Sequence, residues 1–141
     1  MRVLAVDYGD ARTGIAVSDI SATLAGDAWV IHAKSKAEIV NEIITEAVSR
    51  GVSAIVVGHP RNMDGSAGPR AQISEQLAGL LREECASRSQ DGIEVVLWDE
   101  RMTTMSAHRI LTDTGTFGKK RKKTVDAVAA SLILESYLAS R

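Results

Sequence analysis

The sequence predicts a single α/β domain over residues 1–141, in which helices flank a mixed five-stranded sheet. A chain of this length suits one hydrophobic core, because single domains commonly run about 100–150 residues. Hydrophobic residues make up 45% of the chain and charged residues 25%, the ordinary balance of a globular protein rather than of a disordered or fibrous one. Short apolar runs come first and then alternate with helix-like patterns. This order predicts parallel crossover connections and a sheet covered by helices.

Three short runs near the N-terminus predict the first three strands. Residues 2–6 form an apolar run that ends in the turn residues of 7–10. Residues 14–18 follow closely enough to pair with that run as a hairpin. A third short strand is predicted around residues 28–32.

The first helix is predicted to begin after Ser35. Ser35 and Glu38 have the spacing of a capping box, in which each side chain bonds to the backbone amide of the other residue. Gly51 stands where a C-terminal capping glycine is expected. Between these signals, apolar residues recur on one helical face, namely Ile39, Val40, Ile43, Ile44, Ala47 and Val48.

A second apolar strand, a helix and a further strand are predicted next. Residues 54–57 are wholly apolar, which is typical of a strand buried on both faces of a sheet. Residues 58–69 form a loop rich in Gly, Pro and Asn, and a strand follows later at 94–98. The helix between them covers residues 71–86, with four residues predicted to point inward, namely Ile73, Leu77, Leu80 and Leu81.

The C-terminal part predicts two helices and a basic loop. A short helix is expected at 103–112, a loop at 115–123, and a final helix that Thr124 caps and that runs to residue 139. The loop carries five consecutive cations, namely Lys119, Lys120, Arg121, Lys122 and Lys123. Residues 1–118 hold 11 Lys/Arg against 16 Asp/Glu, a net −5, whereas 119–141 hold 6 against 2, a net +4. This asymmetry hints at an anionic partner.

Composition and hydropathy exclude several classes of protein. The two Trp, two Tyr and one Phe are too few for a platform that stacks single-stranded bases. Cys85 is the sole cysteine, so neither an internal disulfide nor a Cys-rich zinc site is expected. No apolar run approaches the roughly 18–20 residues that cross a bilayer. Residues 2–6 open as a strand rather than as a signal peptide, so we expect a cytoplasmic protein with no membrane partner.

Three acidic positions are candidates for chemistry. Asp7 ends the first strand, where α/β sheets place ligand sites, although it could simply start a turn. Asp99 and Glu100 stand at the end of the last predicted strand. Successive side chains of a strand point to opposite faces, so both acids can face one cluster only if the strand stops before them. A solvated strand end is the plainer interpretation there. Asp126 lies in the first turn of the final helix, where the helix dipole alone stabilises an acid, but its apolar neighbours make burial costly without a cation.

Taken together, the acids favour a divalent metal site. Mg²⁺ prefers oxygen ligands and is commonly held by a few carboxylates. Two such ions about 3.5–4 Å apart can act on a phosphodiester. The three histidines, His32, His59 and His108, lack the spacing of zinc ligands, and the sequence has no P-loop. The acids therefore indicate metal and phosphate chemistry.

Four segments, in order along nearly the whole chain, carry a family resemblance. They read Asp-Tyr-Gly-Asp-Ala-Arg-Thr-Gly-Ile-Ala at 7–16, Gly-His-Pro-Arg-Asn-Met-Asp-Gly-Ser at 58–66, Asp-Glu-Arg-Met-Thr-Thr at 99–104 and Lys-Thr-Val-Asp-Ala-Val-Ala-Ala at 123–130. These segments resemble the motifs of the YqgF family, also called RuvX. The resemblance implies an RNase H-like fold. His59 departs from the family pattern, which usually has Leu there, and the basic run is heavier than typical.

The resemblance also implies a function. Family members are described as Holliday junction resolvases and as pre-16S rRNA nucleases. We therefore expect a hydrolase, a metal-dependent endonuclease of structured nucleic acid that processes the 5′ end of pre-16S rRNA in ribosome biogenesis. By resemblance, Asp7, Glu100 and Asp126 are the catalytic and metal-binding residues. As a hypothesis, Asp7 bridges two Mg²⁺ or Mn²⁺ ions, while Glu100 and Asp126 each complete the shell of one ion.

Cations beside the motifs predict a nucleic-acid contact surface, made of Arg12, Arg61, Arg70, Arg101, Lys119, Lys120, Arg121, Lys122 and Lys123. Phosphate contacts of this kind give salt-dependent and largely sequence-independent affinity. The basic run could instead serve only solubility, and Arg101 could simply pair with Asp99. His59 could contact a phosphate, although a solvated loop histidine is the more common case.

Three alternatives stay open from the sequence. One is a resolvase of four-way DNA, which needs two active sites and therefore a dimer, whereas an rRNA nuclease can be a monomer or a homodimer. The second is a catalytically silent nucleic-acid binder that keeps the fold. The third is an ATP-binding module, because Asp-x-Gly after a first strand also opens actin-like ATPases, although those proteins use two such domains.

Overall fold

The computed structural model describes most of the chain. The described residues are 2–9, 11–22, 25–32, 35–102 and 118–140, with the backbone alone at 102 and 118–126. The short helix predicted at 103–112 lies outside them.

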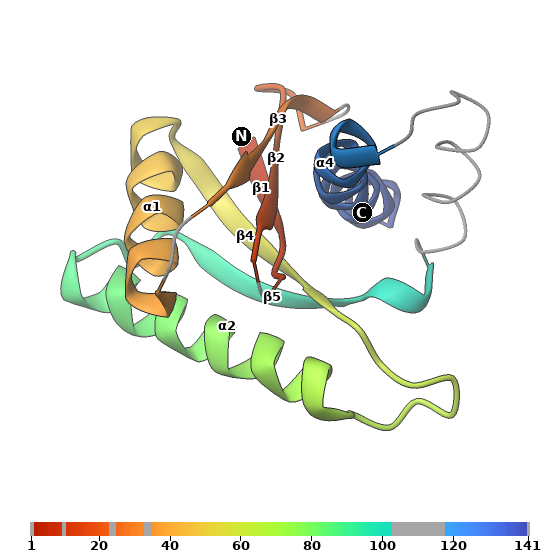
Figure 1. The fold of residues 1–141 in the computed structure, drawn as a ribbon. Coiled ribbons are helices and arrows are strands. Elements are labelled where there is room, and N and C mark those ends of the chain that lie inside the picture. The colour runs from red at the N-terminus through yellow and green to blue at the C-terminus, as the bar shows by residue number, and fades with distance from the viewer. Residues whose placement is uncertain (1, 10, 23–24, 33–34, 103–117, 141) are drawn as a thin grey trace.

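A five-stranded mixed sheet forms the centre of the described structure (Figure 1). Its strands are β1 (Arg2–Asp7), β2 (Thr13–Ser18), β3 (Ala25–Ile31), β4 (Val52–His59) and β5 (Glu94–Asp99), in the spatial order β3-β2-β1-β4-β5. The pairs β1–β2 and β2–β3 are antiparallel, whereas β1–β4 and β4–β5 are parallel. The predicted N-terminal hairpin and the predicted parallel crossovers are both confirmed.

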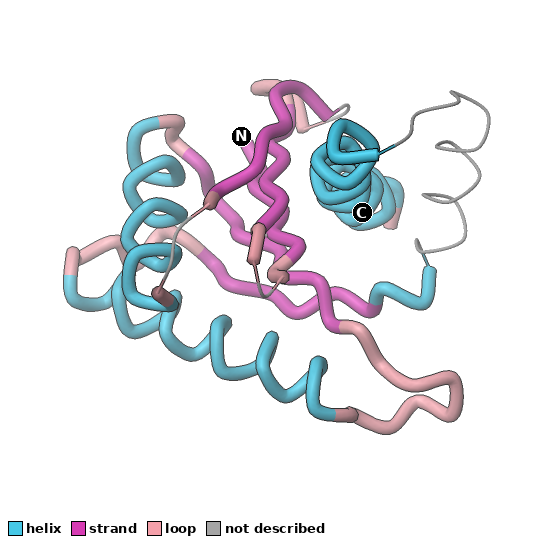
Figure 2. Tube along the Cα trace, viewed as in Figure 1, coloured by secondary structure: helices cyan, strands magenta, loops and turns pink. Residues whose placement is uncertain are grey.

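Helices cover both faces of this sheet (Figure 2). The helices α1 (Lys36–Ser49) and α2 (Pro69–Ser87) share one hydrophobic cluster with the sheet, and α4 (Gly118–Ala139) shares a second cluster on the other face. The side chains of β1 alternate between the two, since Leu4 and Val6 join the first cluster and Val3 and Ala5 the second. Such strands are apolar throughout because both of their faces are buried.

Local sequence signals account for the first helix. Ser35 accepts a hydrogen bond from the backbone N–H of Glu38 at 3.1 Å, and its hydroxyl donates to the Glu38 carboxylate at 2.9 Å. These contacts confirm Ser35 as the N-cap. Gly51 follows the C-cap residue with φ of +65°, a conformation that glycine adopts without strain.

Two predictions about the helices are wrong. The final helix begins at Gly118 rather than at Thr124, so the five consecutive cations lie in its first turns and not in a loop. Lys and Arg are good helix formers, and no glycine or proline interrupts the run. Val48 and Leu80 are exposed rather than inward. Val48 lies about 110° and Leu80 about 125° around the helix axis from the centre of its buried stripe, because successive residues turn by about 100°.

No helix among the described residues is both long and apolar enough to cross a membrane.

Candidate active site at the carboxyl edge of the sheet

Three parallel strands end together at one edge of the sheet. β1 ends at Asp7, β4 at His59 and β5 at Asp99, and His59 stands opposite Asp99 in the ladder. Parallel strands present their carboxyl ends at the same edge, which is where open α/β sheets bind ligands. The two strand-end acids singled out from the sequence are thereby brought to one edge.

Glycine at position 58 makes room for Glu100. Glu100 opens η1 (Glu100–Met102), a single 3₁₀ turn that follows β5 directly. A Cβ atom at Gly58 would lie 2.8 Å from Cδ of Glu100, 3.0 Å from its Oε2 and 2.8 Å from Cδ1 of Ile133 on α4. No larger residue fits there without moving one of these groups. The site therefore lies against the α4 face of the sheet.

The carboxyl groups of Asp7 and Glu100 share a hydrogen bond in this space. Burial raises the pKa of Glu100 to about 8, and the negative charge of Asp7 and the hydrogen bond between the two carboxyls act in the same direction. The positive charge of Arg70 opposes this shift. Without a bound cation, Glu100 is therefore largely protonated at neutral pH, so that only one of the two carboxyls carries charge.

Glu100, and not Asp99, faces Asp7. Asp99 turns away and binds Arg101, with Nε and Nη2 of the guanidinium donating to Oδ2 at 2.8 and 2.6 Å. These bonds hold the pKa of Asp99 below its ordinary value. From the sequence, either Asp99 or Glu100 could face Asp7. Glu100 does so because β5 ends at Asp99 and Glu100 begins the following 3₁₀ turn.

The position of the third predicted acid, Asp126, is described at the level of the backbone. Asp126 lies on α4 four residues before Ala130 and seven before Ile133, a spacing that puts the three positions along one side of a helix. Ala130 and Ile133 are buried against the sheet. Participation of Asp126 in the site stays a prediction.

The donor set of Asp7 and Glu100 suits a hard divalent cation. Both side chains offer carboxylate oxygens, the ligands that Mg²⁺ and Mn²⁺ prefer. A cation between them would also relieve the repulsion that holds a proton on the pair. Within the described side chains, which do not include Asp126, no cluster of three His, Cys, Asp or Glu residues is arranged to hold a metal.

The predicted cationic residues are placed differently from one another. The positive charge of Arg70, at the start of α2, lowers the pKa of Glu100. The positive charge of Arg61 lowers the pKa of Asp99. Both side chains are exposed, whereas Arg12 is half-buried. Arg70 also lines a small hollow with Tyr8, Pro60 and Ile73. The run 119–123 lies in the first turns of α4.

His59 is not a solvated loop residue, as the sequence led us to expect. It is the last residue of β4, it is buried, and its Nε2 lies 3.2 Å from a carboxylate oxygen of Glu75 on α2. The strand extends past the apolar run 54–57, so alternation carries the ring to the α2 face rather than to solvent. Sequence reasoning also missed the space-making role of Gly58, for which a glycine inside the strand was the available signal.

Comparisons with known proteins agree with this architecture. The sequence profile of the RuvX family, described as "Holliday junction resolvase", matches residues 1–140. A protein of Acetivibrio thermocellus named "Putative pre-16S rRNA nuclease" is 42% identical over 142 residues, covering 100% of this chain and 97% of the relative. A relative of the same name from Geobacillus thermodenitrificans is 41% identical over 143 residues, covering 100% and 99%.

Solved structures show the same fold at low sequence identity. Thermus thermophilus RuvC in complex with a Holliday junction substrate matches with a TM-score of 0.61 and 14% identity, covering 99% of this chain and 97% of RuvC. The fowlpox virus Holliday junction resolvase matches with a TM-score of 0.59 and 12% identity, covering 100% of both chains. The fold is therefore RNase H-like, as expected, and the full-length profile match shows that this chain belongs to the RuvX family.

Proposed function

We propose that the protein is a divalent-metal-dependent nuclease that hydrolyses phosphodiesters in structured nucleic acid, and that its substrate is the 5′ end of pre-16S rRNA. The observation that carries this proposal is the hydrogen-bonded pair of Asp7 and Glu100 at the carboxyl edge of the sheet. Two carboxyl groups held together repel each other when both are ionised, so their convergence favours a cation-binding role over a purely structural one. The names of the relatives supply the substrate class.

The roles of the residues follow from their positions. Asp7 and Glu100, with Asp126 as the third proposed ligand, would hold Mg²⁺ or Mn²⁺. A bound divalent ion supplies electrophilic assistance and helps to generate the attacking nucleophile in phosphodiester hydrolysis. Gly58 keeps the space in which Glu100 turns toward Asp7. Asp7 is fixed by its strand pairing with Gly14, so one ligand of the pair rests on a rigid element.

Arg61 and Arg70 are proposed to bind the phosphate backbone beside the acids. Their side chains are exposed, and their charges act at the site itself, on Asp99 and Glu100 respectively. Arg12 and the basic run 119–123 would extend this contact along the nucleic acid. Such a surface predicts affinity that falls steeply with salt and depends little on sequence.

Resolution of four-way DNA is the second candidate function. It is favoured by the match to a RuvC structure that contains a Holliday junction, and by the description of the family profile. A resolvase needs two active sites on one junction. We therefore expect a junction-cutting protein to be a homodimer in solution, whereas an rRNA nuclease can act in the cytoplasm as a monomer.

A cleavage assay tests the proposal. Wild type, Asp7→Asn and the control Asp91→Asn, which changes an exposed turn residue, are incubated with labelled pre-16S rRNA leader and with a four-way DNA junction, in Mg²⁺, Mn²⁺ or EDTA. We expect metal-dependent cleavage of the rRNA leader by wild type and by the control, lost in Asp7→Asn. Preferential cleavage of the junction would favour the resolvase. Salt-sensitive binding without cleavage, equal in all three proteins, would show a silent binder.

A further inference from the structure

We infer that Arg101 is a positioning residue rather than a direct phosphate contact: it holds Asp99 and the β4–α2 loop so that Glu100 alone turns toward Asp7. This inference rests on the proposed function, because it concerns the same acidic pair. It departs from our expectation that Arg101 belongs to the nucleic-acid contact surface.

The hydrogen bonds of Arg101 are directed at Asp99. Its Nε lies 3.1 Å from Oδ1 and 2.8 Å from Oδ2, and its Nη2 lies 2.6 Å from Oδ2. The backbone N–H of Arg101 donates to the same carboxylate at 3.0 Å. One carboxylate thus binds both the backbone and the guanidinium of the residue two places later, which fixes the turn between them.

This arrangement decides which acid enters the site. Asp99 and Glu100 are consecutive, and the charge of Asp99 acts unfavourably on ionised Glu100. By neutralising Asp99, Arg101 lowers that repulsion and keeps a competing carboxylate away from Asp7. Glu100 then occupies the space beside Gly58, and Asp99 stays with Arg101 outside it.

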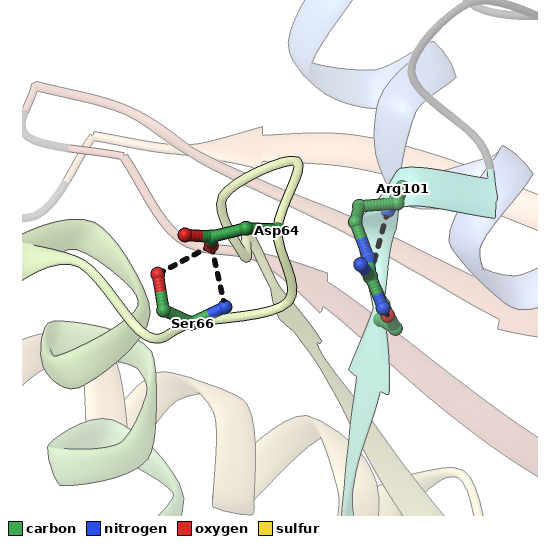
Figure 3. Close-up of polar contacts among 4 residues, drawn as sticks. Asp64, Ser66 and Arg101 are labelled. Carbon is green, nitrogen blue, oxygen red and sulfur yellow. Dashed lines mark hydrogen bonds and ion pairs between the residues drawn. The ribbon is translucent and has the colours of Figure 1, made fainter.

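Arg101 also lies against the loop between β4 and α2. Its Nη1 lies 3.5 Å from the position of a Cβ on Gly65, and its charge acts on Asp64. The loop is a compact turn, because Asp64 accepts from the backbone N–H of Ser66 at 2.9 Å and from its hydroxyl at 2.6 Å. Figure 3 shows these two bonds, with Arg101 beside the loop at the end of β5. Arg101 therefore lies beside the loop that carries Arg61 while it binds Asp99 at the end of β5.

The two roles of Arg101 predict opposite results for its partner. If Arg101 acts through Asp99, removing either side chain disturbs the same arrangement, and removing both adds little. If Arg101 binds phosphate, removing Asp99 frees the guanidinium and leaves substrate binding intact or stronger. A double-mutant cycle therefore separates the two.

The test compares Asp99→Asn, Arg101→Ala, Arg101→Lys and the double variant with wild type, by Mn²⁺ titration followed by electron paramagnetic resonance and by cleavage kinetics. We expect each single change to weaken Mn²⁺ binding about tenfold or more, as loss of groups that orient metal ligands does. We expect the double variant to be no weaker than the worse single variant, and kcat to fall more than KM rises. Arg101→Lys should rescue only in part, because an ammonium cannot make the planar two-point contact.

A remote ion pair provides the matched control. Nη1 of Arg50, the residue after α1, lies 3.0 Å from Oδ2 of Asp27 on β3. Asp27→Asn should leave the Mn²⁺ affinity unchanged. Unchanged Mn²⁺ affinity in Arg101→Ala, with a raised and salt-dependent KM, would overturn the inference and restore Arg101 as a phosphate contact.

A readout independent of metal and substrate keeps this inference separate from the proposed function. The backbone N–H groups of Asn62, Gly65 and Ser66 are hydrogen-bonded within the loop. Arg101→Ala should speed hydrogen exchange of these amides, and Asp99→Asn should do so equally. If wild type binds no Mn²⁺ and cleaves nothing, the proposed function fails, and exchange alone decides the inference. Unchanged exchange in Arg101→Ala would then overturn it.

Discussion

The acidic pair at the carboxyl edge and the charged cluster around Arg50 use similar side chains to opposite effect. Arg50 binds Glu46 at 2.8 Å and Asp27 at 3.0 Å and stacks on the Trp29 ring, so each charge there meets an opposite one. Asp7 and Glu100 instead bring two acidic groups together, with Glu100 largely buried, so that ionisation of one opposes ionisation of the other. The first arrangement is typical of a surface that stabilises the fold, and the second of a surface that needs a ligand.

The difference also appears in the titration of the two groups. The hydrogen bonds that Arg50 donates to Glu46 and Asp27 raise the pKa of Arg50, which strengthens a charge already present at every physiological pH. Burial beside Asp7 raises the pKa of Glu100 to about 8, which removes a charge near neutrality. Protonation or a bound cation therefore stabilises the acidic pair in the folded state.

The largest expected effect comes from removing a proposed metal ligand. Asp7→Asn and Asp126→Asn should each lower the cleavage rate by more than about 100-fold, because replacing a ligand costs more than disturbing the groups that orient one. The change is measured as single-turnover cleavage in Mg²⁺. If Asp126→Asn cleaves at the wild-type rate while Asp7→Asn does not, the third acid lies outside the site.

A smaller effect is expected from filling the space at Gly58. Gly58→Ala places a methyl group against Glu100 and Ile133 and should lower the free energy of unfolding by about 1–3 kcal/mol, together with the cleavage rate. Denaturant unfolding measures the first and single-turnover cleavage the second. Gly79→Ala is the matched control, since nothing lies within 4 Å of its Cβ position on α2. That change should stabilise the protein by up to about 1 kcal/mol and leave cleavage unchanged.

Removal of metal should make stability depend on pH through Glu100. Its folded-state pKa of about 8 lies above the ordinary value of 4.5, so the folded protein holds a proton that the unfolded chain releases between these values. In EDTA, the free energy of unfolding should therefore fall as pH rises from 4.5 to 8, by roughly 2–4 kcal/mol after allowance for solvent screening.

Glu100→Gln removes this titration and should flatten the pH dependence of unfolding. Thermal unfolding in EDTA across that range measures the effect, with Glu83→Gln on the exposed side of α2 as control. An equal slope in wild type and Glu100→Gln would show that another group titrates.

The smallest effect is expected at the Arg50 cluster. Asp27 is largely exposed, so Asp27→Asn should cost about 0.2–1 kcal/mol in the free energy of unfolding, less at high salt. Cleavage should not change. A large loss of cleavage would contradict the division between the two regions.

The features predicted correctly from the sequence are those set by local chemistry. The capping box at Ser35 and the apolar run of β4 define their elements within a few residues, and two of the motif acids, Asp7 and Glu100, lie at one edge of the sheet. These signals depend on residues close together in the sequence and on runs of apolar residues, both of which a single sequence contains.

The features that the sequence did not reveal depend on where an element ends. The choice of Glu100 over Asp99 required the end of β5 and the start of a 3₁₀ turn, and the burial of His59 required β4 to extend beyond its apolar run. The dense charge at 119–123 predicts a solvent-exposed loop, but Lys and Arg favour helix and these residues form the first turns of α4. Strand and helix boundaries are decided by tertiary contacts, which no local pattern contains.

Whether the Asp7–Glu100 pair is the active site is decided by cleavage of the two nucleic-acid substrates by Glu100→Gln, beside wild type and Glu83→Gln. Glutamine keeps the size of the side chain and the hydrogen-bonding contact with Asp7, and it removes the carboxylate that a divalent ion would bind. We expect metal-dependent cleavage by wild type and Glu83→Gln, and its loss in Glu100→Gln at unchanged or higher thermal stability. Cleavage by Glu100→Gln at the wild-type rate would contradict the claim that the Asp7–Glu100 pair is the active site.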